Sequence, residues 1–154
     1  MTRMGKRGWS AVTVACWALV GLTGCGGAYD SSVSGVVTLD GSPIGRGTVA
    51  YHPVGGGPAG YARIDENSEY SVRTGREEGL PSGEYDVTVV ANEPPAVERT
   101  TLGGPPPPGK PITPPWYRSP QTSGLRFAVE EGSNEINLEL STEPPPGYDP
   151  RRRR

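Results

Sequence analysis

Apolar and polar residues alternate with a period of two in seven short segments of the chain. Such alternation buries one face of an extended segment and leaves the other in solvent, so it is typical of β-strands. The strongest example is 84–91, where Tyr85, Val87 and Val89 share one face. The other six segments are 32–39, 47–52, 59–65, 70–72, 125–129 and 136–140.

Turn-forming residues separate these segments. Asp40-Gly41 predicts a hairpin turn after the first segment, and Gly132-Ser133-Asn134 predicts a closing hairpin between the last two. Segments 59–65 and 70–72 are expected to form a further hairpin. No gap between the segments carries a helical period, which disfavours parallel βαβ units. The pattern predicts an all-β, seven-stranded antiparallel sandwich over residues 33–141.

A Pro-rich insert interrupts this pattern before the last two segments. Residues 92–124 hold ten of the 18 prolines of the chain. We expect 94–111 to form a polyproline-type spacer, because proline favours extended backbone. Residues 112–124 are expected to be more ordered, because Trp116 and Tyr117 require apolar cover.

The two ends of the chain differ from its middle. Residues 142–154, with three consecutive prolines and four terminal arginines, are expected to be a disordered tail. The N-terminus begins with basic residues and then runs from Gly8 to Gly24 without a charge, which is typical of a secretory signal. That uncharged run has 17 residues, fewer than the roughly 20 that a membrane-spanning helix needs.

Leu22-Thr23-Gly24-Cys25 follows this run and resembles the lipobox of bacterial lipoproteins. The resemblance implies that 1–24 is a lipoprotein signal peptide, that Cys25 receives the lipid, and that 25–32 is a tether. More than one acyl chain on Cys25 would anchor the protein durably to a membrane. The implied location is exported, lipid-anchored to the cell membrane or outer membrane, on the periplasmic or outer side. The alternatives are an ordinary signal peptide with an incidental Cys25, or an uncleaved anchor.

Charge and cysteine content narrow the function classes. Removal of residues 1–24 takes away Arg3, Lys6 and Arg7 and leaves 12 of the 15 basic residues against 17 acidic residues, so the exported part is acidic. An acidic body argues against nucleic-acid binding. Cys16 would leave with the signal and Cys25 would carry lipid, so no thiol is left for a disulfide, a metal or catalysis.

The spacing of glycines, tyrosines and valines resembles a known family. The motifs are Val33-x-Gly35-x-Val37, Asp40-Gly41-x-Pro43-Ile44, Gly47-x-Val49-x-Tyr51, Asp65-x-x-x-x-Tyr70 and Leu80-Pro81-x-Gly83-x-Tyr85-x-Val87. They resemble the carboxypeptidase regulatory-like domain, a transthyretin-like (prealbumin-like) β-sandwich, over residues 33–91. The segment from Pro115 to Leu125 and the predicted closing hairpin are similar to small secreted lipoproteins of that fold in planctomycete-type bacteria. The resemblance implies a seven-stranded sandwich outside the cytoplasm, with no known activity.

The chain departs from the family pattern in two places. Ser68-Glu69 stands where a glycine is expected between Asn67 and Tyr70, and the Pro-rich insert is unusually long. Both departures leave loop function open.

Few residues offer catalytic chemistry. His52 is the single histidine, so a histidine cluster for metal binding or acid–base work is excluded. The adjacent carboxylates are interpreted as solvated loop charges, because neighbours on extended chain point apart. Tyr117-Arg118-Ser119 invites comparison with the C-terminal motif of the transthyretin-fold hydroxyisourate hydrolase, but the glycine and the further histidines are missing. We therefore expect no catalytic, cofactor or metal site.

Trp116 and Tyr117 are the candidate binding surface. They suit an aromatic platform for a sugar or a peptide, or they pin the insert across an open sheet edge. Our interpretation is a non-enzymatic, lipid-anchored cell-envelope protein with a structural or protein-binding role. A carbohydrate-binding module using Trp116 and Tyr117 is the alternative, with an envelope polysaccharide as partner, and a hydrolase of the transthyretin-fold type is third.

Overall fold

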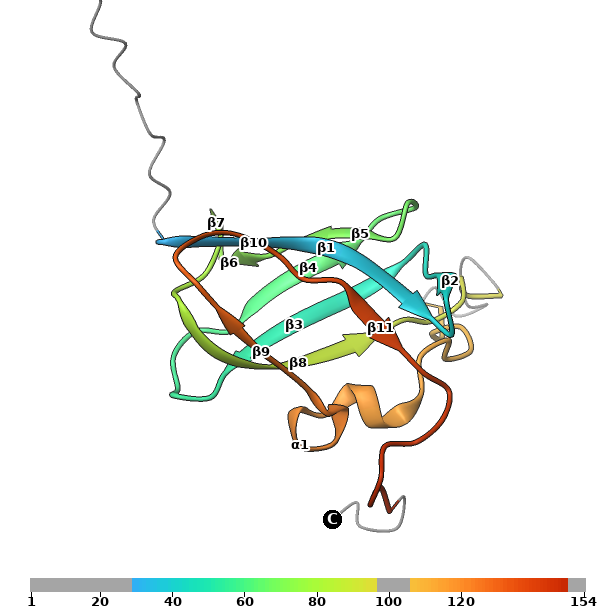
Figure 1. Cartoon of the computed structure of the whole chain (residues 1–154). Coiled ribbons are helices and arrows are strands. Elements are labelled where there is room, and N and C mark those ends of the chain that lie inside the picture. Colours follow the sequence, from blue (N-terminus) through green and yellow to red (C-terminus); the bar gives the residue numbers. More distant parts are fainter. Residues whose placement is uncertain (1–28, 97–105, 150–154) are drawn as a thin grey trace, which may run out of the picture.

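The structure is a computed structural model that describes residues 29–96 and 106–149 (Figure 1). Almost all of its elements are β-strands, which form two sheets around one core. Each of the seven alternating segments overlaps a strand, and four further strands of two to four residues complete the sheets of the described part. The prediction of an all-β fold is confirmed.

The first sheet is built around β1 (Ser31–Leu39). This strand pairs antiparallel with β2 (Ser42–Pro43) and with β5 (Glu69–Ser71). It also pairs parallel with β10 (Gly132–Glu135) along its first half and with β11 (Leu138–Leu140) along its second half. The first and last strands of the described chain are therefore neighbours.

The second sheet has six strands, in the order β7-β6-β4-β3-β8-β9, and every pairing in it is antiparallel. β3 and β8 form its longest ladder, from Thr48 opposite Val90 to Pro53 opposite Tyr85. The strand bounds are β3 Gly47–Pro53, β4 Gly60–Ile64, β6 Arg73–Thr74, β7 Glu77–Glu78, β8 Gly83–Val90 and β9 Leu125–Val129.

The predicted turn after β1 is confirmed. Thr38 pairs with Pro43 and Leu39 with Ser42, which leaves Asp40 and Gly41 as a two-residue loop. Asp40 has a φ of 49° and Gly41 a φ of 76°. Positive φ at both loop residues is what a type I′ hairpin turn requires.

The predicted closing hairpin is wrong. β9 pairs with β8 in the second sheet, whereas β10 and β11 pair with β1 in the first. The turn around Glu130 and Glu131 therefore carries the chain from one sheet to the other. The expectation of a purely antiparallel sandwich is wrong for the same reason, because both of these pairings with β1 are parallel.

The predicted hairpin of 59–65 with 70–72 is also wrong. β4 pairs with β3 and with β6, whereas β5 pairs with β1. The turn and its closing bond are as expected, since Ser68 N donates to Asp65 O at 3.1 Å and Asp65 N donates to Glu69 O at 3.0 Å. The chain then bends between β5 and β6, so that one extended stretch contributes to both sheets.

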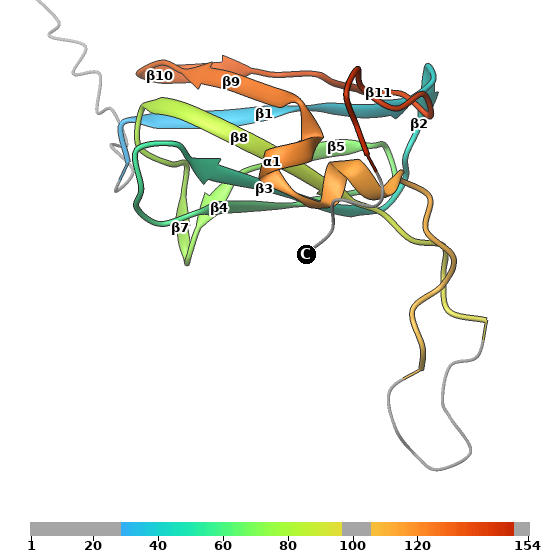
Figure 2. The same cartoon turned by 90° about the horizontal axis from the view of Figure 1, so that it is seen from below.

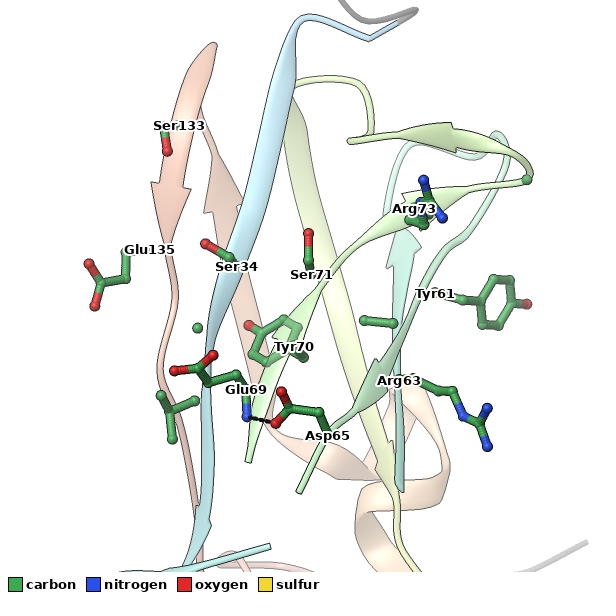
Figure 3. Close-up of a pocket in the computed structure, with 14 residues that line it drawn as sticks. Ser34, Tyr61, Arg63, Asp65, Glu69, Tyr70, Ser71, Arg73, Ser133 and Glu135 are labelled. Carbon is green, nitrogen blue, oxygen red and sulfur yellow. Dashed lines mark hydrogen bonds between the residues drawn. The ribbon is translucent and has the colours of Figure 1, made fainter. Parts of the chain in front are cut away.

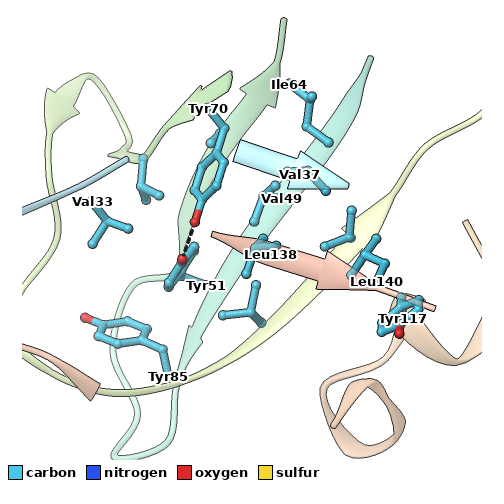
Figure 4. Packing of buried hydrophobic residues seen from close by; sticks show 14 of the residues in the cluster. Val33, Val37, Val49, Tyr51, Ile64, Tyr70, Tyr85, Tyr117, Leu138 and Leu140 are labelled. Carbon is cyan, nitrogen blue, oxygen red and sulfur yellow. Dashed lines mark hydrogen bonds between the residues drawn. The ribbon is translucent and has the colours of Figure 1, made fainter. Parts of the chain in front are cut away.

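Side chains from both sheets fill the core (Figure 4). The predicted inward face of 84–91 is confirmed, since Tyr85, Val87 and Val89 are buried. Opposite them lie Val37 of β1 and Leu138 of β11, both without exposed surface. Burial of each such side chain contributes about 1.5–3 kcal/mol, so this contact between the sheets holds the fold together.

A chain of buried hydroxyl groups crosses this core. Tyr70 Oη donates to Ile136 O at 2.7 Å, and Tyr51 Oη lies 2.7 Å from Tyr70 Oη. The single hydroxyl hydrogen of Tyr70 is used on Ile136, so Tyr51 is the donor to Tyr70. Tyr85 Oη donates to Pro81 O at 2.7 Å. A tyrosine hydroxyl that bonds back to the backbone a few residues upstream is the tyrosine-corner contact of β-sandwiches.

The ends of the described chain are held against the sandwich. Asp30, expected in the tether, accepts hydrogen bonds of 2.9 Å from both the backbone and the hydroxyl of Ser82. Thr142 donates to Asp40 through its backbone (3.1 Å) and its hydroxyl (2.7 Å). The expectation of a disordered tail is therefore wrong for 142–149, because tertiary contacts order this part. Residues 1–28 and 150–154, with the signal segment and Cys25, lie outside the described residues.

Candidate functional site

The Pro-rich insert leaves the sandwich at the end of β8 and returns along the same strand. Ile112 N donates to Ala91 O at 2.9 Å. The hydroxyl of Thr113 accepts from Ala91 N at 3.0 Å and donates to Val89 O at 3.3 Å. Thr113 is buried, so its side chain replaces backbone groups that a regular strand would supply.

The two arms of the insert are joined where they leave the domain (Figure 2). Asn92 forms an antiparallel bridge with Pro111, and Glu93 N donates to Lys110 O at 2.7 Å. A Cβ on Gly109 would collide with the carbonyl oxygen of Glu93, so this close approach requires glycine. The spacer prediction falls partly on 97–105, outside the described residues.

Two short helices lie in the last part of the insert, as expected for an ordered 112–124. They are the 3₁₀ helix η1 (Pro115–Arg118) and α1 (Pro120–Ser123). Each begins with a proline, whose missing N–H costs nothing in a first turn. α1 ends at Gly124, which has a φ of 68°. This is the left-handed conformation that glycine adopts without strain.

Trp116 and Tyr117 lie on η1 and are both buried, with 8% and 6% of their surface exposed. Their ring centroids are 6.0 Å apart. Tyr117 Oη accepts from Ser141 N at 2.9 Å, which connects η1 to the chain after β11. In this arrangement neither ring offers the exposed face on which a sugar would stack.

The position of η1 explains this burial. β9 pairs with β8 only as far as Val87, opposite Leu125, so the rest of that β8 edge has no β9 partner. The returning arm and the helices pack against this part of β8. An open strand edge invites pairing with other chains, and the cover removes that hazard. This geometry is the one expected if Trp116 and Tyr117 pin the insert across an open sheet edge.

A third aromatic residue, Tyr148, completes the cluster. Its ring lies edge-on to Trp116, with 5.2 Å between centroids and 63° between planes. The indole N–H of Trp116 is buried and has no hydrogen-bond acceptor within the described residues. Sequence reasoning missed Tyr148. An aromatic residue directly after Pro144-Pro145-Pro146-Gly147, in a tail otherwise without large apolar residues, was the available signal.

A shallow groove of about 1040 Å³ lies between β4 of one sheet and β5 and β10 of the other (Figure 3). Tyr61, Arg63 and Arg73 line one side, and Glu135 lies on the other. Arg73 forms an exposed ion pair with Glu78 at 3.0 Å. Asp65 and Glu69 also line the groove, so acidic and basic side chains are mixed along it and indicate no single ligand charge.

The residues considered for catalysis serve the fold. His52 is half-buried on β3, with Nε2 3.1 Å from the hydroxyl of Thr88. Asp65 Oδ1 accepts from the backbone N–H groups of Asn67 and Glu69, both at 2.9 Å, and so shapes the turn before β5. Within 29–96 and 106–149 no three His, Cys, Asp or Glu side chains gather as metal ligands.

Shifted pKa values report contacts of the fold. Hydrogen bonds from Thr142 lower the pKa of Asp40, and those from Ser82 lower the pKa of Asp30. Burial raises the pKa of Tyr70 to about 12, with an opposing effect of the hydrogen bond from Tyr51. Burial also raises the pKa of Tyr51, and Tyr70 adds to that shift. These tyrosines are therefore neutral at physiological pH.

The comparisons with known proteins add no relative: no family model, curated protein or solved structure matches the chain. None of the helices in the described part has the length and apolar character that crossing a membrane requires.

Proposed function

We propose that the chain is a non-enzymatic, lipid-anchored protein of the cell envelope, whose sandwich presents the Pro-rich insert to a partner protein. The observation that carries this proposal is that the start of β1 and the base of the Pro-rich insert lie at opposite ends of the sandwich (Figure 1). The chain enters β1 at one end of the sandwich, and the insert leaves from the other end (Figure 1). β1, with its nine residues, runs between these ends. A strand of that length spans roughly 30 Å.

The construction of the insert supports a display role. Its arms are joined by the bridge between Asn92 and Pro111, and its return is bonded to β8 through Thr113. Pro107 and Pro108, further along the arm, are exposed. Extended Pro-rich segments bind aromatic grooves on partner domains at a low entropic cost. A fixed base with exposed prolines is suited to that mode of recognition.

The family assignment belongs to the same proposal. Two facing sheets and the tyrosine corner of Tyr85 support a transthyretin-like, carboxypeptidase regulatory-like sandwich. Gly35 and Gly47 support it further. A Cβ on Gly35 would collide with Ile136 O, and Gly47 has a φ of 150° beside Val90 O. The motif glycines thus stand where this packing requires them.

The anchor is tested by labelling cells with a fatty-acid analogue. We expect the wild-type chain to take up the label and to fractionate with membranes. Cys25→Ser is expected to lose the label and to accumulate unprocessed or be released. Cys16→Ser is the matched control, because Cys16 lies inside the uncharged run. A wild-type chain without label would contradict the lipid anchor.

The display role is tested by photo-crosslinking in intact envelopes. A photoreactive residue at exposed Pro107 is compared with one at exposed Tyr61, on the side of the sandwich. We expect a discrete protein adduct from position 107 and none of the same mass from position 61. The same adduct from both positions, or none from 107, would contradict presentation by the insert.

A further inference from the structure

We propose that the Trp116 surface of η1 is a recognition site for Pro-rich peptides that contain a tyrosine, and that residues 143–149 of the chain occupy it as a displaceable strap. This inference goes beyond presentation of the insert, because it assigns a second binding surface with its own ligand chemistry. The sequence of the strap is Glu143-Pro144-Pro145-Pro146-Gly147-Tyr148-Asp149.

The strap places one aromatic side chain on Trp116. Tyr148 N donates to Pro145 O at 3.0 Å, and Gly147 between them has a φ of 84°. This tight turn directs the tyrosine ring to the edge-on contact with Trp116 at 5.2 Å. Pro145 and Tyr148 are half-buried, whereas Pro146 is exposed. The tyrosine and one proline of the strap are therefore partly covered by the domain, as in a docked peptide.

The indole of Trp116 indicates which ligand chemistry fits. Its N–H is a donor only, and it is buried without an acceptor in the described part of the chain. Proline residues offer carbonyl acceptors and no backbone N–H donors, so a Pro-rich peptide is complementary to an unpaired donor. The strap is connected to β11 and does not supply that acceptor. A separate peptide is not held in that register by a connection to β11.

The attachment of the strap permits exchange. Its base is held by the bonds between Thr142 and Asp40, on an exposed part of the surface. Its far end is held by Tyr148, and exposed prolines lie between the two points. A strap on such a short connection has an effective concentration in the millimolar range. Peptide binding must therefore be measured after the strap has been weakened.

The experiment uses the full chain with Trp9→Phe and Trp17→Phe, which leaves Trp116 as its single tryptophan. Acrylamide quenching of Trp116 is compared between this parent, Tyr148→Ala and Tyr148→Phe. Tyr61→Ala is the matched control, because Tyr61 is 54% exposed and lies on the groove side of the sandwich. The probe is a capped peptide of residues 143–149. Its two variants replace the tyrosine, or all three prolines, by alanine.

We expect Tyr148→Ala to raise the quenching of Trp116, with parent behaviour in Tyr148→Phe and Tyr61→Ala. The capped peptide is expected to reverse this quenching in Tyr148→Ala at least tenfold more effectively than either alanine peptide. The parent is expected to respond at least tenfold more weakly than Tyr148→Ala. Gly147→Ala, which strains the turn but keeps the ring, is a second variant in case Tyr148→Ala alters the melting temperature.

Three results would overturn the proposal. Unchanged quenching in both Tyr148→Ala and Gly147→Ala would mean that the strap does not cover Trp116. If Trp116 becomes exposed in these variants but millimolar peptide does not reduce its quenching by acrylamide, the surface recognises no such ligand. Protection by a chitooligosaccharide instead of the peptide would assign the surface to carbohydrate. None of these results depends on the lipid anchor or on the exposed prolines Pro107 and Pro108 of the insert.

Discussion

The hydroxyl of Tyr70 donates to the carbonyl of Ile136 at 2.7 Å, and this bond fixes a break between two strands. In a regular parallel ladder that carbonyl would accept from the N–H of Val36. Val36 N instead donates to the side-chain oxygen of Asn137 at 2.9 Å. The Ile136 carbonyl is thereby free to face Tyr70 in the core, where the missing Cβ of Gly35 leaves room for it.

Tyr70→Phe should destabilise the domain by about 1–3 kcal/mol, because the part-buried carbonyl of Ile136 and the buried hydroxyl of Tyr51 both lose their partner. Tyr51→Phe should cost less, since Tyr70 still donates to Ile136. Tyr61→Phe is the exposed control and should be neutral. Urea unfolding measures all three. Equal losses of stability for Tyr51→Phe and Tyr70→Phe would contradict the assignment of Tyr51 as donor to Tyr70 and of Tyr70 as donor to Ile136.

Gly35→Ala should destabilise more strongly than an ordinary surface change, by about 1–3 kcal/mol or more, because the new methyl group overlaps the Ile136 carbonyl. Gly55→Ala is the matched control, since a Cβ there meets no atom within 4 Å. Thermal melting of both variants measures the difference. A Gly35→Ala variant as stable as Gly55→Ala would mean that the Ile136 carbonyl does not face the core.

Ser68→Gly should stabilise the domain by about 1 kcal/mol, after the entropic cost of glycine is deducted. Ser68 has a φ of 70° and a buried hydroxyl without a partner in the described chain, so glycine removes both penalties. Asp40→Gly is the contrasting control. Asp40 also has positive φ, at 49°, but its carboxylate binds Thr142. Urea unfolding should therefore give the two changes opposite signs.

Joint replacement of Trp116 and Tyr117 by alanine should lower stability severely, since a buried tryptophan alone contributes about 3–5 kcal/mol. Replacement of exposed Pro107 and Pro108 by serine should leave melting unchanged. Retention on polysaccharide is measured on the same variants. A normal melting temperature of the double alanine variant, combined with lost retention, would favour the carbohydrate-binding alternative.

The bond from Thr142 should make the C-terminal strap sensitive to acid. The pKa of Asp40 is lowered from 3.8 in the folded chain, so its stabilising contribution is complete above that pH. The contribution is lost as the pH falls through the lower pKa of the folded state. Quenching of Trp116 in the single-tryptophan chain should therefore rise below pH 3.8. Asp40→Asn, which cannot titrate, should lack that step.

The sequence predicts which side chains face the core better than it predicts which strands pair. Alternation alone identifies the buried face of 84–91, because an extended chain must bury every second side chain. Leu125–Val129 and Leu138–Leu140 both show such a face, and alternation does not distinguish pairing with each other from pairing with β8 and β1. Only the assembled core decides between these pairings.

The candidate site likewise has one part that the sequence predicts and another that it does not. The burial of Trp116 and Tyr117 is predictable, because large aromatic side chains require cover. The bond between Asp40 and Thr142 is not, since the two residues are 102 positions apart and their contact depends on the parallel pairing of β1 with β11. The docking of Tyr148 depends on that pairing in turn. In the sequence of the tail alone, the three prolines give no sign that Tyr148 contacts Trp116.

The parallel pairing of β1 with β10 and β11 also has a kinetic consequence. Val36 and Asn137, which meet in this ladder, are 101 residues apart, and closure of so long a loop precedes any gain from the contact. Domains rich in such distant contacts fold slowly, in milliseconds to seconds. During synthesis β1 emerges first and keeps an unpaired edge until almost the whole chain has followed. The interval in which this protein is open to chaperones, to an export machinery or to misassembly is therefore set by its last strand.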